Sequence, residues 1–437
     1  MKIDELHIEN FKKFGAQDID LHEHFTLLVG ENGAGKTTVL DALAVAAGVW
    51  LLDPPDSILI NSGRKILPAD IRLEPQTKGD RIQFHERRPV IVRATGRIAE
   101  RDQVVWTRQI RAAQKNTTNA DAEDARQIIK TVYARDSAGE NVLCPVLAYY
   151  GAGRAWLPSN ERVPKSKANG PAMRWAAFYD CFNERIRFDE LQKWFSRETT
   201  ERGNRGGKWR PGFEVVRRAV LRCVPDADDV WFDTDRDQIV LSIKGNSQPF
   251  DNLSAGQRMM LALIADLAIK VVTQNAYLLP PDELGPEDEP LARVLQLTPG
   301  LVLIDEVDVH LHPIWQRRIA TDLKSTFPAI QFVCTSHSPQ LIGELQPDEI
   351  RLMHDNEFSQ PALSFGMDSN WVVEVLMGGS KCNGQVKDRL ANVFQLIKDR
   401  KLAEAEREAL LMRGEIGNSD ELQRAVSMLE RIKLLGK

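Results

Sequence analysis

The chain has 437 residues, of which 43% are hydrophobic and 27% are charged, the balance of a globular protein with one large domain and insertions or with two domains. A net charge of −5 excludes an overall basic surface for nucleic acid, and the five scattered cysteines form no C-x-x-C pair of the kind that holds zinc. The N-terminus is strand-like and not a signal peptide, and no apolar run approaches the roughly 20 residues that cross a bilayer, so we expect a cytoplasmic protein without a membrane partner.

The first predicted elements are two strands, at residues 2–9 and 18–29, followed by a glycine-rich loop and a helix to about residue 49. The loop has the spacing G-x-x-x-x-G-K-T from Gly30 to Thr37. Its glycines allow a tight turn whose backbone N–H groups face a phosphate, and the start of the helix adds a positive dipole. We therefore predict an ATP site in which Lys36 reaches the β- and γ-phosphates and Thr37 binds Mg²⁺. The predicted nucleotide ligands of this loop are Asn32, Gly33, Ala34, Gly35, Lys36, Thr37 and Thr38.

Further strands are predicted after this helix. Stretches rich in Val, Ile, Thr and Arg at residues 82–84, 90–97 and 103–111 predict an antiparallel sheet beside the nucleotide site. The polar, alanine-rich residues 112–128 predict a mobile segment. Residues 142–150 form an apolar run that predicts a buried strand, which continues into Gly151-Ala152-Gly153-Arg154.

Residues 172–224 have apolar side chains at three- and four-residue spacing, which predicts a helical lid or arm. The segment from Arg197 to Arg222 contains eight Arg or Lys and three Glu, a charge of about +5. Such a run is either a solvated flexible loop, the more common case, or a phosphate-tracking patch with aromatic contacts from Trp209 and Phe213. A hairpin is predicted next, at residues 230–243.

A second candidate phosphate site lies at Leu253-Ser254-Ala255-Gly256-Gln257, at the start of a predicted helix that ends near residue 272. Ser254 can cap that helix, and Gly256 lets a phosphate approach the helix N–H groups. An ordinary helix cap would explain this sequence on its own. Because the chain already has a glycine loop for its own nucleotide, we predict that Ser254, Gly256 and Gln257 grip the γ-phosphate bound to another subunit.

Two apolar runs in the second half end in residues that can act on a nucleotide. The run at residues 301–304 ends in Asp305 and Glu306, so we predict that Asp305 holds Mg²⁺ and that Glu306 orients or deprotonates the attacking water. The run at residues 330–335 precedes His337, which can donate a hydrogen bond to the γ-phosphate. Strand ends converge at one crevice of an α/β sheet, so these side chains should meet Lys36 there.

These assignments give three predicted catalytic residues, Glu306, His337 and Lys36, and two predicted Mg²⁺ ligands, Thr37 and Asp305. A nearby histidine pair, His310 and His312, lacks a third His or a Cys to complete a zinc site. We therefore expect packing or interface roles for that pair.

The motifs together resemble those of ABC-type ATPases. Walker A, signature, Walker B and switch-histidine motifs are matched at residues 30–37, 253–257, 301–306 and 335–337. The D-loop-like segment at residues 306–313 resembles the RecF, SMC and OLD-like branch and differs from transporters. Residues 149–154 and 368–371 are similar to those of compact antiphage-defence ATPases of the Septu and retron-associated types.

The chain also departs from this branch. Its middle is too short for a long coiled-coil arm, and the usual glutamine is absent after the strand at residues 142–150. The roughly 100 residues after His337 lack the acidic motifs of a Toprim nuclease, so an intrinsic OLD-type nuclease is not expected.

The resemblance implies an α/β fold, an ABC-type ATPase head. Such a head has a P-loop mixed-sheet core and an antiparallel β subdomain, to which this chain adds a helical lid insertion and a helical C-terminal tail. We accordingly divide the chain into lobe I at residues 1–165, the lid or arm at 166–228, lobe II at 229–365 and the C-terminal extension at 366–437.

The resemblance further implies a homodimer or higher oligomer with its ATP and Mg²⁺ sites between subunits. ATP would close the dimer and hydrolysis would release it. The expected output is control of DNA or of a separate effector nuclease, as a sensor and regulator in antiphage defence. A RecF-like DNA-repair ATPase that binds DNA directly remains an alternative. A transporter ATPase subunit is another, although the D-loop sequence argues against it.

Overall fold

The computed structural model describes residues 1–54, 63–78, 81–153, 174–280, 291–379, 384–417 and 419–435. The chain divides into two compact units, Met1–Asp368 and Ser369–Lys437. The domain boundaries that we predict near residues 165 and 228 both fall inside the first unit, and they remain predictions.

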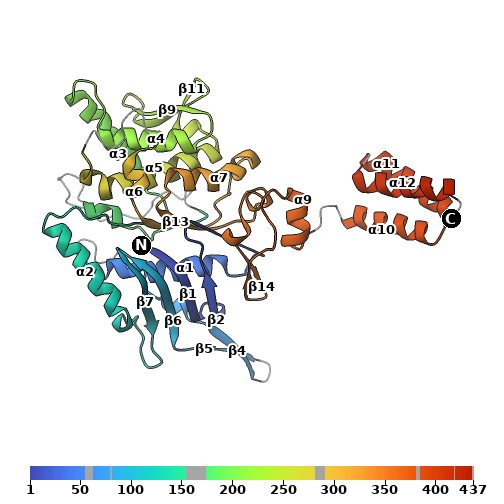
Figure 1. Cartoon of the computed structure of the whole chain (residues 1–437), viewed down its shortest axis with the longest axis horizontal. Helices are drawn as coiled ribbons and strands as arrows, with labels where there is room; N and C mark the ends of the chain where they lie inside the picture. The colour runs from blue at the N-terminus through green and yellow to red at the C-terminus, as the bar shows by residue number, and fades with distance from the viewer. Residues whose placement is uncertain are drawn as a thin grey trace. The chain divides into compact units, whose positions relative to one another are not determined.

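The first unit is built on a six-stranded sheet with the strand order β15-β14-β3-β13-β12-β8 (Figure 1). Neighbouring strands are parallel from β14 to β8, and β15 is antiparallel to β14. Strands β3, β8, β12 and β13 are almost entirely buried, which explains their continuous apolar sequences. The strands are β3 (Phe25–Gly30), β8 (Val146–Tyr150), β12 (Gly300–Ile304), β13 (Ile330–Thr335), β14 (Ile350–His354) and β15 (Glu357–Ser359).

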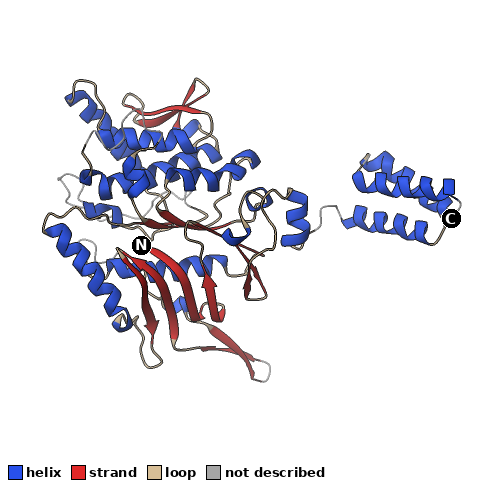
Figure 2. Ribbon diagram, viewed as in Figure 1, coloured by secondary structure: helices blue, strands red, loops and turns tan. Residues whose placement is uncertain are grey.

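A four-stranded antiparallel sheet, ordered β2-β1-β6-β7, confirms the predicted β subdomain. Its strands are β1 (Lys2–Phe11), β2 (Phe14–Asp20), β6 (Val90–Ile98) and β7 (Arg101–Ile110). Helix α1 (Lys36–Ala47) contacts both this sheet and the central sheet, and nearly all of its residues are buried (Figure 2). An amphipathic pattern is absent from α1 because it has no solvent face.

The stretch at residues 82–84 does not join that sheet. It belongs to a separate two-stranded ribbon of β4 (Leu73–Lys78) and β5 (Arg81–Glu86). Almost every residue of the ribbon is exposed, so burial could not have tied it to the neighbouring strands.

Helices cover the other face of the central sheet, opposite α1 (Figure 1). They are α3 (Phe188–Asn204), α4 (Pro211–Cys223), α5 (Ala255–Asn275), α6 (Arg293–Leu297) and α7 (Pro313–Thr326). The predicted hairpin is present within a three-stranded sheet of β9 (Ala227–Asp233), β10 (Gln238–Ile243) and β11 (Asn246–Pro249), which packs on α3 and α4. The helical prediction for residues 172–224 is confirmed for α3 and α4.

We expected no apolar run long enough to cross a membrane, but helix α5 provides one. Together with the turn that follows, Ala255–Leu278 is long and apolar enough to cross a membrane by length and composition, with a mean hydropathy of 1.4. However, 72% of the most apolar 18-residue window in this segment is buried inside the protein, as expected for the central helix of a packed layer.

The prediction of a mobile segment at residues 112–128 is wrong for its second part. Helix α2 (Glu123–Ser137) begins there and buries Ala125, Ile129, Val132 and Tyr133. The Tyr133 hydroxyl donates a hydrogen bond to the Trp50 carbonyl at 2.6 Å. Tertiary contacts of this face outweigh the polar composition that suggested mobility.

The second unit confirms the predicted helical tail. It contains α9 (Ser369–Trp371), α10 (Gly384–Lys398), α11 (Leu402–Ile416) and α12 (Asp420–Leu435). The last three helices pack around an apolar core of their own, formed by Leu390, Val393, Ile397, Ala405, Ala409, Met412, Leu422, Ala425 and Leu429.

Candidate functional site

The glycine loop joins β3 to α1, as the spacing predicts. Gly33 and Gly35 have φ values of +80° and +105°, a region that side-chain-bearing residues rarely adopt. A Cβ at Gly35 would also lie 2.6 Å from the Phe14 ring, and a Cβ at Gly30 would lie 2.6 Å from the Met353 carbonyl oxygen. The glycines are therefore required for the loop shape itself.

Lys36 is held inside this loop. Its Nζ donates hydrogen bonds to the carbonyl oxygens of Gly30, at 2.8 Å, and Glu31, at 3.0 Å. Burial lowers the pKa of Lys36, and the nearby carboxylates, Asp305 first, partly offset this effect. The loop thus positions a partly desolvated ammonium, which a phosphate would stabilise more strongly than neutral carbonyls do.

Asp305 links the ends of two strands to the first turn of α1. It follows β12, and its Oδ2 accepts a hydrogen bond from the Thr37 hydroxyl at 2.9 Å. Its Oδ1 accepts one from the hydroxyl of Thr335, the last residue of β13, at 2.6 Å. The Thr37 hydroxyl and the Asp305 carboxylate are adjacent hard oxygen donors, so they fit the Mg²⁺ that accompanies ATP.

Thr335 is a site residue to which the sequence interpretation gave no role. Its hydroxyl donates to Asp305 and also accepts a hydrogen bond from the Glu306 backbone N–H at 2.7 Å. It is fully buried. The available signal was a threonine at the end of an apolar strand, two residues before His337, but its contacts depend on β12 and β13 being neighbours.

Glu306 begins a sharp turn away from the sheet. Its φ is +48°, in the left-handed region. The turn is held because the Val307 N–H donates to the Thr335 carbonyl at 3.0 Å, and the Val309 N–H donates to the Glu306 carbonyl at 3.0 Å. The structure thus places Glu306 directly beside the Asp305–Thr37 pair. Its role as the base remains a prediction.

His337 follows β13, beside the end of β3. The next residue, Ser338, caps the short helix α8 (Pro339–Ile342), and the Ser338 hydroxyl donates to Gln316 at 2.8 Å. The His337 imidazole is half-buried, and no hydrogen bond or ion pair engages it within the described part of the chain. The predicted hydrogen bond from His337 to the γ-phosphate therefore remains a prediction.

Ser254 is exposed and caps α5. Its hydroxyl accepts from the Gln257 N–H at 3.3 Å, and the Gln257 side chain accepts from the Ser254 N–H at 2.9 Å. This reciprocal pair is a capping box, which fixes the first turn of the helix.

Gly256 has a packing role that we did not predict. A Cβ there would lie 2.7 Å from the His310 carbonyl oxygen, so the glycine lets α5 pack against the turn that contains Glu306. The contact links the predicted signature to the predicted catalytic carboxylates within one chain. Phosphate contact by Ser254, Gly256 and Gln257 remains a prediction.

Of the histidine pair, His312 has a structural contact. Its Nδ1 accepts a hydrogen bond from the Ile314 N–H at 3.4 Å and caps α7. Among the described residues, no group of three or more His, Cys, Asp or Glu is arranged to hold a metal ion. Packing or interface roles for His310 and His312 remain a prediction.

In the basic segment from Arg197 to Arg222, the side chains around Arg210 contact one another. Arg210 forms ion pairs with Glu198, at 3.3 Å, and with Glu201, at 2.5 Å. The Trp209 ring stacks on Phe213 at 3.9 Å, and the Arg202 guanidinium lies 4.5 Å from the same ring. Because its ring is already engaged, Trp209 offers little to a nucleic-acid base, which favours the solvated-loop interpretation.

The segment after β8 gives no glutamine to the site. Residues 151–153 are described, whereas Arg154 lies outside the described residues. The end of β8 still contributes, because the Tyr150 carbonyl accepts a hydrogen bond from the Asp305 N–H at 2.8 Å and the Tyr150 hydroxyl donates to Asp266 at 2.7 Å.

Comparison with family models gives two matches along the chain. Residues 5–202, which contain the glycine loop, match a model described as "AAA domain". Residues 240–343, which contain Ser254, Asp305 and His337, match a model described as "AAA domain, putative AbiEii toxin, Type IV TA system".

Two curated relatives extend over most of the chain. It is 26% identical to "Retron Ec83 probable ATPase" of Escherichia coli, over 86% of this chain and 76% of that protein. It is 24% identical to "Septu protein PtuA" of Bacillus mycoides (strain KBAB4), over 81% of this chain and 41% of that protein. Among solved structures, an SMC head bound to the C-winged helix domain of ScpA is 16% identical with a TM-score of 0.45, over 83% of this chain and 98% of that one.

Proposed function

We propose that this chain is an ABC-type ATPase of the RecF/SMC-like branch, and that two copies close around ATP and Mg²⁺ and separate after hydrolysis; its AAA-domain matches and its retron and Septu relatives support the ATPase assignment. The observation that carries this proposal is the contrast between two phosphate-binding devices. Lys36, Thr37 and Asp305 lie together where β3 and β12 end, and Thr37 is hydrogen-bonded to Asp305. Ser254 instead is exposed and caps α5, a helix on the face of the sheet opposite α1.

Within each site, the residues of one copy perform most of the chemistry. Lys36 and the loop N–H groups bind the phosphates, while Thr37 and Asp305 would hold Mg²⁺, which neutralises charge on the phosphate oxygens when bound. Glu306 accepts a proton from the attacking water, and His337 donates a hydrogen bond to the γ-phosphate. Through its two hydrogen bonds, Thr335 fixes the positions of the Asp305 side chain and the Glu306 backbone.

The second copy completes the site. Its Ser254 hydroxyl and the first N–H groups of its α5, from Gly256 and Gln257, face the γ-phosphate. Loss of the γ-phosphate removes these contacts, so hydrolysis lowers the affinity between the two copies. The Gly256–His310 packing then transmits the change to the turn at Glu306.

We further propose that this cycle serves antiphage defence by controlling a separate effector nuclease or DNA. The retron and Septu relatives support this role. A RecF-like ATPase that binds DNA directly is the competing function, and strongly salt-dependent DNA binding by the purified protein would favour it. The paired charges around Arg210 and the engaged Trp209 argue against that alternative.

The composite site is tested by mixing two inactive variants, Lys36→Ala and Ser254→Asp. Asp is a good helix cap, so Ser254→Asp should keep α5 stable while repelling the γ-phosphate. A mixed dimer contains one intact site, formed by Lys36 of one copy and Ser254 of the other, so mixing should restore up to about a quarter of wild-type turnover.

Steady-state ATPase measurements on each variant and on the mixture test whether two copies share each site. Ser254→Ala serves as the stability control, since it removes the cap without adding charge. If Ser254→Asp alone hydrolyses ATP at the wild-type rate, Ser254 takes no part in the site and the proposed dimer is wrong.

A further inference from the structure

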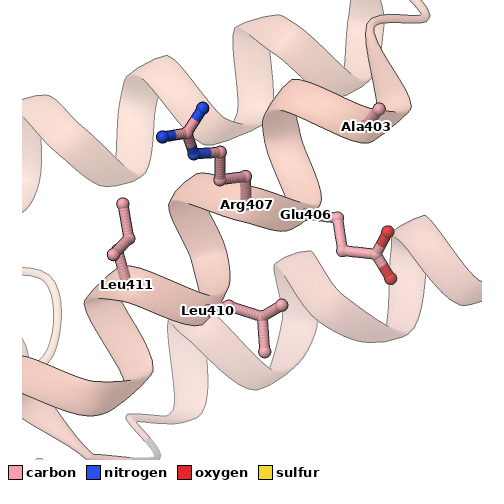
Figure 3. Close-up of a pocket in the computed structure, with 5 residues that line it drawn as sticks. All are labelled: Ala403, Glu406, Arg407, Leu410 and Leu411. Carbon is pink, nitrogen blue, oxygen red and sulfur yellow. The ribbon is translucent and has the colours of Figure 1, made fainter.

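Helix α11 of the C-terminal unit has a second apolar face that its own core does not use. The core side chains Ala405, Ala409 and Met412 are buried against α10 and α12. In contrast, Leu410 is 61% exposed and Leu411 is 52% exposed. These two leucines line a surface pocket with Ala403, Glu406 and Arg407, and all five side chains project from successive turns of α11 (Figure 3).

Helical geometry makes these positions one stripe. At 100° per residue, Ala403, Arg407, Leu410 and Gly414 follow each other along the side of the helix opposite the core, with Glu406 and Leu411 flanking them. We call these six residues the outer stripe. An exposed apolar stripe of this kind on a surface helix marks an interaction site more often than a solvated face.

Gly414 is a second, independent observation. A glycine inside a helix costs about 1 kcal/mol relative to alanine. A Cβ at Gly414 would meet nothing within 4 Å, and its φ is not positive, so neither packing within the described unit nor backbone shape requires a glycine. A small residue on an outward helix face is, however, useful where another helix backbone passes close by.

The charged residues of the outer stripe indicate which helix would bind it. Glu406 and Arg407 are adjacent, so an antiparallel copy of the same helix brings each glutamate within reach of an arginine. Glu406 is also paired with Lys433 at 2.6 Å, but both side chains are about half exposed, and such a surface pair contributes little and exchanges easily. Lys433 lies on the neighbouring helix α12, outside the outer stripe.

We propose that the outer stripe of α11 binds the outer stripe of a second copy of this chain, antiparallel about a two-fold axis. With the axis near the middle of α11, Leu410 packs on the aliphatic part of the partner's Arg407, and Leu411 lies beside the partner's Glu406. Ala403 then lies opposite the partner's Gly414, so that small residues meet where the two backbones are closest. Each contact occurs twice, as required of a two-fold interface.

This contact needs no nucleotide. It rests on the proposed function for its purpose, since it would hold two ATPase units together through the part of the cycle in which neither site contains ATP. A tethered pair of copies has an effective concentration far above that of free protein, which favours renewed closure when ATP binds.

The first experiment measures the oligomeric state of the full chain by sedimentation velocity without nucleotide. The wild type should be dimeric at micromolar concentration. The double variant Leu410→Glu, Leu411→Glu should raise the dissociation constant by about 100-fold, because each copy loses both leucine contacts and places a carboxylate at position 411 beside the partner's Glu406. Leu434→Glu is the matched control, because Leu434 is 86% exposed on α12 and lies outside the outer stripe. It should leave the dimer intact.

The second experiment exchanges the charges. Glu406→Arg and Arg407→Glu should each weaken the homodimer, because like charges then face each other across the axis. An equimolar mixture of the two variants should form a heterodimer of wild-type affinity, since one copy is then doubly positive and the other doubly negative.

A nucleotide-free wild type that remains monomeric overturns the proposal, and so does a double leucine variant that remains dimeric. Loss of a co-purifying nuclease from the double variant, with the dimer retained, also overturns it by showing that the stripe binds an effector. Because no ATP is present, these outcomes are independent of whether Ser254 completes the ATP site.

Discussion

The two predicted phosphate-binding devices of the first unit differ in how they are held. At the glycine loop, Lys36 and Asp305 are buried and Thr37 is exposed, and hydrogen bonds of 2.8–3.0 Å tie Lys36 to the loop carbonyls and Thr37 to Asp305. At the start of α5, Ser254 is exposed and is held only by its own first helical turn. The first device is preorganised for a nucleotide within one chain, whereas the second is rigid but faces outward. The following changes test that comparison.

The largest effect is expected from Glu306→Gln. Loss of a positioned general base typically costs between 10² and 10⁴ in rate, so turnover should fall by about 1,000-fold. ATP affinity should be unchanged, because the glycine loop remains intact, and the nucleotide-bound dimer should accumulate. Single-turnover hydrolysis and equilibrium binding of a fluorescent ATP analogue measure the two quantities separately. Wild-type turnover in this variant would show that another group acts as the base.

Lys36→Ala should weaken ATP binding by about 100-fold, because it removes at least two charge-assisted hydrogen bonds to phosphate. Lys13→Ala is the matched control. The Lys13 ammonium also donates to a loop carbonyl, that of Gly33, at 2.7 Å, but Lys13 is exposed and lies outside the predicted phosphate ligands. Isothermal titration of ATP into each variant makes the comparison, and equal losses in the two would contradict a special role for Lys36.

Thr335→Val should have an intermediate effect. The side chain keeps its volume but leaves the Glu306 N–H and one Asp305 oxygen without their partner, which costs about 1–3 kcal/mol of folding stability. Turnover should fall about tenfold because Asp305 is less well oriented. Urea unfolding and ATPase assays measure both. Thr335→Ser keeps the hydroxyl and should restore most of the loss, an outcome that a purely steric role would not give.

The smallest effect concerns pH. Burial lowers the pKa of Lys36 below its ordinary 10.5, and bound triphosphate should raise it again. Between the lowered pKa and 10.5, Lys36 is deprotonated in the nucleotide-free protein and protonated in the ATP complex. ATP affinity should therefore decrease as pH rises through this range. The same depressed pKa means that folding stability increases with pH there, because the unfolded chain binds the extra proton. Lys36→Arg, whose guanidinium stays charged, should abolish the pH dependence of ATP affinity.

Much of the glycine-loop site could be predicted from sequence because each of its motifs is a short continuous stretch of residues. The spacing from Gly30 to Thr37 dictates a loop that only glycines can form, and the strand before it is a continuous apolar run, as is the strand before Asp305. Asp305 and Glu306 were recognisable for the same reason, since both directly follow such a run. The cap at Ser254 is likewise a short-range pattern, completed three residues later by Gln257.

The remaining features depend on contacts between distant segments. Thr335 acquires its role only because β13 lies between β3 and β12, and Gly256 because α5 meets the turn at His310. The sequence left Trp209 as a candidate nucleic-acid contact, but in the fold its ring already contacts Phe213 and Arg202. The sequence alone therefore indicated the candidate nucleotide ligands, because backbone shape and hydrophobic runs depend on short stretches of sequence. Tertiary structure decided which neighbours orient them and which polar or aromatic groups are already engaged, because those pairings join residues far apart in the chain.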